Sequence, residues 1–159
     1  MGIHNKNKKL LVDWNATLIS GVISGVVFYL LNLFLIPYVY GGTYLTVIRY
    51  ISSVFLGERI LPPPATFDLT ALIVSLVFII LLSLIFTLIV SYVLHKGGII
   101  TGIIGGAIFG VAFYYIFFNS LTLFYPWLYS LKNEMTLINF TILGILSGGL
   151  YETFEVEKS

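Results

Sequence analysis

The sequence has no cysteine, two histidines and few charged residues. Only 9% of its 159 residues are charged, whereas a soluble domain carries about 25% because its surface faces water. Without cysteine there are no disulfides, thiolate metal sites or cysteine nucleophiles, and no basic stripe offers a site for nucleic acid. The charges are too few to cover a water-facing surface, so the lipid bilayer is the expected surrounding and first partner.

Apolar residues make up most of the chain. They account for 58% of the sequence, and the mean hydropathy is +1.02. Four apolar segments, at about 15–40, 69–94, 98–119 and 135–154, are long enough to cross a hydrocarbon core of about 30 Å. We therefore expect an all-α polytopic membrane protein with four transmembrane helices in two hairpins. Residues 15–154 form its single domain, with a basic tail at 1–14 and a second tail at 155–159.

Residues 43–57 predict a shorter helix in the first loop between spans. At 1.5 Å per residue this segment reaches about 21 Å, too short for the hydrocarbon core. Arg49 near its middle would cost roughly 3 kcal/mol at mid-membrane. We expect an amphipathic helix that lies at the interface or dips partly into it. Arg49 itself is interpreted as an anchor to lipid phosphate, as the partner of Glu58 or Asp68, or as an anion contact.

Glycines recur at four-residue spacing in three of the predicted spans. Because residues four apart share a helix face, such glycines let a neighbouring helix approach closely. A groove that holds a flat cofactor or substrate is the other interpretation of the longest series, but we expect no cofactor. The predicted helix-packing glycines are Gly21, Gly25, Gly102, Gly106, Gly110, Gly144 and Gly148.

A few polar side chains lie within or at the ends of the spans. Asn32 is expected to bond across to another helix, because an amide in lipid needs a partner, or to line a substrate path. Ser83 and Thr87 share one face, interpreted as a helix contact or as a pore lining. Asn119 is expected to close the third span.

Basic residues predict the orientation. With four spans, Lys6, Lys8, Lys9, Lys96 and Lys158 share one side, and Arg49, Arg59 and Lys132 share the other. Loops on the cytoplasmic side carry the excess of Lys and Arg, so both termini are expected in the cytoplasm. The cysteine-free composition, rich in Tyr and Ile, fits a prokaryotic inner membrane.

Several motifs carry a resemblance to known proteins. They are the first glycine pair, Arg49 with Gly57-Glu58, the stretch LPPPATFD at 61–68, the glycine-rich third span and FYPW at 124–127. In these the chain resembles a group of small four-helix bacterial membrane proteins that are sometimes labelled sodium:proline symporters. The resemblance implies a four-helix fold and a membrane location, and it carries no activity.

Apart from Glu152 near the end of the last one, the predicted spans contain no carboxylate, histidine or lysine, and their tyrosines and serines lack an activating base. Acid-base and nucleophilic catalysis need a titratable group beside the reacting atom, so neither an enzyme nor a metal site is expected. The favoured hypothesis is an accessory or structural subunit that packs against a larger membrane complex or against itself, because the glycine series offer more packing faces than one chain uses. The alternative is a small oligomeric channel or transporter for a small solute or ion.

Overall fold

A computed structural model describes residues 12–95 and 97–155, and the described chain is helical. Its four long helices are α1 (Trp14–Tyr40), α3 (Leu69–Leu94), α4 (Ile99–Phe124) and α5 (Glu134–Phe154). The short helix α2 (Tyr44–Leu56) follows α1, and the 3-10 turns η1 (Glu58–Ile60) and η2 (Pro126–Leu131) lie in the loops. Most of the two predicted tails, namely residues 1–11 and 156–159, falls outside the described residues.

Polar caps fix where the helices begin. Asp68 accepts hydrogen bonds from the backbone N–H groups of Thr70 and Ala71, at 2.8 and 3.2 Å, and α3 begins at the next residue. Asp13 caps α1 in the same way. A side-chain acceptor at this position satisfies backbone donors that have no partner within the helix. The start of α3 at Leu69 was predicted on this ground.

The end of α4 differs from the prediction. Asn119 was expected to close the helix, but α4 continues to Phe124. The amide oxygen of Asn119 accepts a hydrogen bond from Lys132 Nζ at 2.9 Å, so this side chain is held by the following loop and does not compete for the backbone of its own helix. The loop is correspondingly shorter than expected, and η2 fills most of it.

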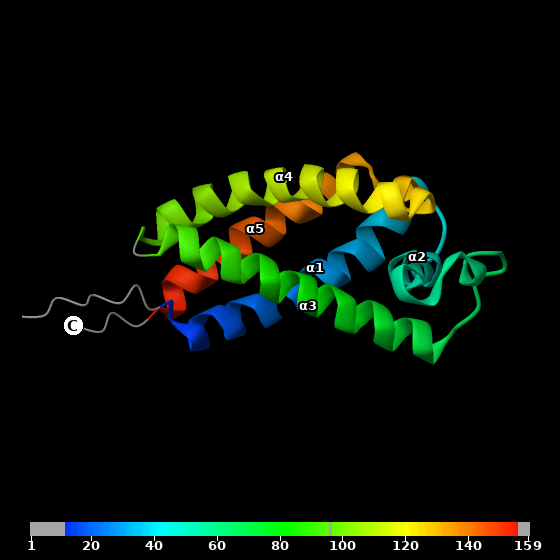
Figure 1. Cartoon of the computed structure of the whole chain (residues 1–159), viewed down its shortest axis with the longest axis horizontal. Helices are drawn as coiled ribbons and strands as arrows, with labels where there is room; N and C mark the ends of the chain where they lie inside the picture. The colour runs from blue at the N-terminus through cyan, green and yellow to red at the C-terminus, as the bar shows by residue number, and fades with distance from the viewer. Residues whose placement is uncertain (1–11, 96, 156–159) are drawn as a thin grey trace, which may run out of the picture.

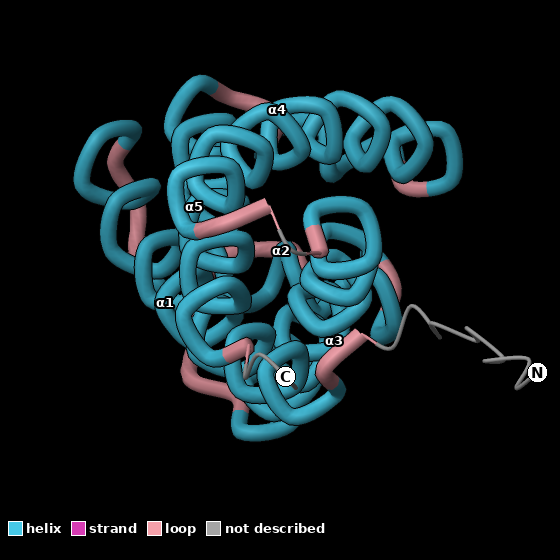
Figure 2. Tube along the Cα trace, turned by 90° about the vertical axis from the view of Figure 1, so that its left-hand side faces the viewer, coloured by secondary structure: helices cyan, strands magenta, loops and turns pink. Residues whose placement is uncertain are grey.

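The long helices form a three-helix core with a fourth helix attached. Helices α1, α3 and α5 contact one another, and α4 packs along α5. Helices α3 and α4 are joined by a short turn and diverge from it, so they contact each other only weakly. Figure 1 shows α2 nearly end-on at the wide end of this divergence, across the long axis of the bundle, and Figure 2 shows the bundle from its end.

The seven predicted packing glycines lie at two helix contacts. A Cβ atom on Gly106 would overlap the carbonyl oxygen of Gly144, and one on Gly102 would lie 2.6 Å from the carbonyl oxygen of Gly148. A Cβ on Gly110 would overlap the carbonyl oxygen of Phe140. In the core, Gly21 and Gly25 of α1 face α3, where an added Cβ would lie 2.8 Å from a side-chain atom of Leu84 and 2.9 Å from one of Ser83. The backbones of α4 and α5 therefore touch directly.

The lengths and hydropathies of these helices define the class of protein. Within the described residues, α1, α3, α4 and α5 are each long and apolar enough to cross a membrane. The chain is a multi-pass membrane protein of the all-α class.

Candidate ligand cavity

A cavity of about 40 Å³ lies under α2, where α3 and α4 diverge. Its inner wall comes from buried side chains of α1, α5 and η2, such as Phe28, Phe140 and Leu128. Half-buried side chains from three helices form its mouth. We define the mouth by Val54 of α2, Phe78 and Leu82 of α3, and Phe117 and Leu121 of α4. Four of these five residues lie on α3 and α4, which are long and apolar enough to cross a membrane.

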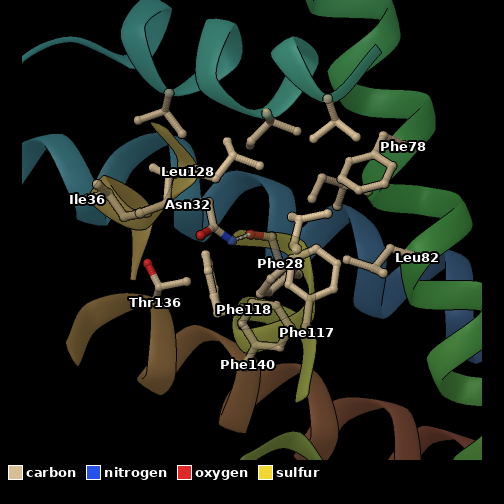
Figure 3. Close-up of a pocket in the computed structure, with 16 residues that line it drawn as sticks. Phe28, Asn32, Ile36, Phe78, Leu82, Phe117, Phe118, Leu128, Thr136 and Phe140 are labelled. Atoms are coloured by element: carbon tan, nitrogen blue, oxygen red, sulfur yellow. Dashed lines mark hydrogen bonds between the residues drawn. The ribbon is translucent and has the colours of Figure 1, made fainter. Parts of the chain in front are cut away.

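Asn32 is the polar group of interest in the wall. Its amide nitrogen donates a hydrogen bond of 2.7 Å to the carbonyl oxygen of Phe28, one turn earlier in α1. The expectation of a bond across to another helix is therefore wrong, because the side chains that face Asn32 from other elements are mainly apolar. Figure 3 shows the amide oxygen of Asn32 pointing away from Phe28, toward the side of the cavity where Ile36 and Thr136 lie.

Arg49 holds the loop that follows α2. Its Nη1 donates to the carbonyl oxygen of Ile60 at 3.1 Å and contacts those of Pro62 and Pro64 at 3.4 Å. Its Nη2 donates to the carbonyl oxygen and the hydroxyl of Thr66, at 3.1 and 2.9 Å. A proline-rich segment cannot form a helix, so its carbonyl oxygens are free to accept.

The predicted ion pair of Arg49 is not formed. Among the described residues the one ion pair joins His95 to Glu155, and Arg49 pairs with neither Glu58 nor Asp68. The guanidinium instead satisfies its donors on loop oxygens. Arg49 thus fastens α2, the roof of the cavity, to the loop that leads into α3.

Replacing Arg49 by alanine is expected to loosen this loop. Five contacts are lost, most of them exposed, so the net cost is about 1 kcal/mol. Amide hydrogen exchange at Thr66 and Phe67 should become roughly five to ten times faster. Arg59→Ala is the matched control, because Arg59 makes a single 3.3 Å bond to the carbonyl oxygen of Leu56. Equal exchange rates in the two variants would contradict the role given to Arg49.

Ser83 and Thr87 lie in a buried hydroxyl seam, outside the cavity. Ser83 donates to the carbonyl oxygen of Gly21 at 2.8 Å, and Thr87 donates to the hydroxyl of Ser147 at 2.9 Å. Both side chains are fully buried. They join α3 to α1 and to α5, and in this arrangement they act as helix contacts.

Several contacts at the α2 end of the bundle could not be predicted from the sequence. Trp127 donates through Nε1 to the hydroxyl of Ser53 at 2.9 Å, which ties η2 to α2. Phe140 lies at the centre of an aromatic cluster with rings from α1 and α4. The four-residue spacing of Phe113 and Phe117 predicts a shared face, but it does not predict which ring they meet.

The opposite end of the bundle holds a polar cluster. His95, after α3, contacts Glu155, after α5, and its Nδ1 lies 3.1 Å from the hydroxyl of Tyr151. Glu152 accepts from the backbone N–H of Gly98 at 2.9 Å, which holds the turn between α3 and α4. No group of three or more His, Asp or Glu side chains suited to a metal ion occurs in the described part of the chain.

The fold defines a multi-pass membrane protein, and its cavity is lined by residues of α1, α2, α3, α4, α5 and η2. No known family model, curated protein or solved structure matches the chain. The resemblance to small four-helix bacterial proteins therefore has no support from these comparisons, and function has to be argued from the molecule itself.

Proposed function

We propose that the chain is a non-catalytic integral membrane protein that serves as an accessory or structural subunit of a larger membrane complex. The attachment of α4 supports this most directly. Of its apolar span, 22% is buried, whereas 50% of the span of α1 is buried. Helix α4 is covered mainly along its glycine face. Its other faces remain available to a helix of another protein.

The glycine series do not add to this support. They were expected to offer more packing faces than one chain uses, but all three series contact helices of the same chain. The proposal depends instead on the outward face of α4. We define this face by Ile104, Ile108, Val111 and Tyr115, which are exposed and share one side of the helix.

For location, we propose a prokaryotic cell membrane with both chain termini in the cytoplasm. The α2 end carries Arg49, Arg59 and Lys132, whereas the sequence has five lysines before α1, between α3 and α4 and after α5. This distribution supports the orientation, because cytoplasmic segments carry the excess of basic residues.

A small oligomeric channel or transporter is the second candidate. It is favoured by polar atoms of Ser20, Ser24 and Asn139, which are fully buried and have no hydrogen-bond partner among the described residues. Such groups are costly in a membrane, and a polar solute could satisfy them. The packed interior argues against a path through one chain, so this function would require several copies.

Photo-crosslinking in the native membrane tests the accessory role. Benzoylphenylalanine placed at Ile108, on the outward face of α4, should crosslink the chain to one partner protein. The product should be a single adduct of defined, higher molecular mass. The same group at Ile19 of α1 is the control, since Ile19 is also exposed but lies on a helix that contacts α2, α3 and α5. Native mass spectrometry of the gently extracted chain should give the same partner in fixed stoichiometry.

Two results together would contradict the accessory role. If position 108 yields no protein adduct and the chain emerges alone as a symmetric oligomer, the accessory role is wrong. Solute flux in liposomes that contain the purified oligomer would then support the channel or transporter.

A further inference from the structure

The cavity under α2 combines apolar walls with one open hydrogen-bond acceptor. Of the residues that line it, Asn32 and Thr136 carry polar side chains. The hydroxyl of Thr136 already donates to the amide oxygen of Asn133, at 3.1 Å. The amide oxygen of Asn32 has no donor among the described residues, although Asn32 is only 5% exposed.

The orientation of the Asn32 amide is fixed by its neighbour. A carbonyl oxygen can only accept a hydrogen bond, so the amide atom 2.7 Å from the carbonyl of Phe28 must be the nitrogen. The oxygen therefore points into the cavity, as Figure 3 shows. An acceptor that faces apolar side chains without a donor is unfavourable, so a ligand that brings one donor would be stabilised here.

Water fits this place poorly. A buried water molecule typically makes about three hydrogen bonds to protein groups. Here Asn32 offers one acceptor and Thr136 a hydroxyl that is already engaged, among phenylalanine, leucine, isoleucine and valine side chains. A ligand that donates one hydrogen bond and is otherwise apolar matches the site better.

The position of the cavity selects ligands that reside in the bilayer. Its mouth lies between α3 and α4, so the ligand enters sideways from lipid. Asn32 lies eight residues before Tyr40, the last residue of α1, which is about 12 Å along the helix axis. A charged headgroup held at the membrane surface does not reach this depth, whereas the hydroxyl of a single-chain alcohol can.

We propose that this cavity binds a long-chain aliphatic alcohol of the membrane. The hydroxyl donates to the amide oxygen of Asn32, and the chain leaves between Phe78 and Leu82 of α3 and Phe117 of α4. This binding goes beyond the accessory role and does not require a protein partner.

A competition experiment on the full-length purified chain tests the proposal. The chain is placed in phosphatidylcholine vesicles and labelled with a diazirine derivative of 1-decanol. Label should appear on residues of the mouth. Unlabelled 1-decanol should compete about tenfold better than its methyl ether, because the ether has the same chain and no donor and a buried hydrogen bond contributes about this factor.

Asn32→Leu separates the hydrogen bond from the shape of the cavity. This variant should lose the preference for 1-decanol over its methyl ether. A diazirine derivative of the methyl ether should still label the mouth of the cavity. Asn119→Leu is the matched control, because Asn119 is exposed and bound to Lys132, and it should keep the preference.

Equal competition by 1-decanol and its ether in the unmodified chain would overturn the proposal, whether or not Asn32→Leu folds. Label found only outside the mouth would overturn it as well. Neither result depends on the crosslinking experiment above, which uses native membranes and detects a protein partner.

Discussion

Replacing Gly144 by alanine is expected to separate α4 from α5 and to destabilise the bundle. The added Cβ would overlap the carbonyl oxygen of Gly106, and both of these atoms are attached to backbone, so no side-chain rotation relieves the collision. Overpacking costs about 1–3 kcal/mol and sometimes more, and the upper end applies here. For a chain of this size the melting temperature should fall on the order of 10 °C.

Gly149→Ala is the control for this experiment. It introduces the same methyl group on the same helix, where the nearest atom is the side-chain Cγ1 of Ile103 at 3.1 Å. A flexible side chain can shift by a few tenths of an ångström, so this variant should melt close to the unmodified chain. Thermal unfolding in detergent, followed by circular dichroism, measures both. Matching melting temperatures for the two variants would show that the backbones of α4 and α5 are not in direct contact.

Replacing Phe140 by alanine should have a comparable or larger effect. The ring of Phe140 is 2% exposed and lies 4.9 Å from that of Phe28 and 5.9 Å from that of Phe113, measured between centroids. Removing it leaves a cavity where α1, α4 and α5 meet. Phe→Ala changes in packed interiors cost about 3–5 kcal/mol, so the melting temperature should fall by on the order of 10 °C or more.

The matched control is Phe34→Ala. Phe34 is 64% exposed on α1, where it faces the bilayer, and changes at such positions usually stay within about 0.5 kcal/mol. The same thermal unfolding assay applies to both variants. A loss at position 140 no greater than at position 34 would mean that the aromatic cluster does not hold the helices together.

Local chemistry made much of the fold predictable. The bounds of α3 follow from Asp68, which caps it, and from the glycines after His95. The error at Asn119 shows the limit of such reasoning. An asparagine near a helix end is a plausible point for the helix to stop. Here, however, Lys132, thirteen residues later, donates a hydrogen bond to the amide oxygen of Asn119. No local sequence pattern predicts that contact.

The candidate site was less accessible to sequence reasoning. Arg49 was recognised as a charge in need of partners, yet the sequence drew attention to carboxylates when the free carbonyls of the proline segment were the acceptors. Asn32 was recognised as well, but the direction of its amide depends on which groups face it. The cavity itself depends on the divergence of α3 and α4 and on the placement of α2, which are long-range features.

The central position of α5 has a consequence for how the protein is made. This helix contacts α1, α3 and α4, yet it is synthesised after all of them. Until it enters the membrane, the glycine face of α4 has no cover, and the hydroxyl of Thr87 lacks Ser147. Assembly of the bundle therefore cannot be completed until α5 enters the membrane.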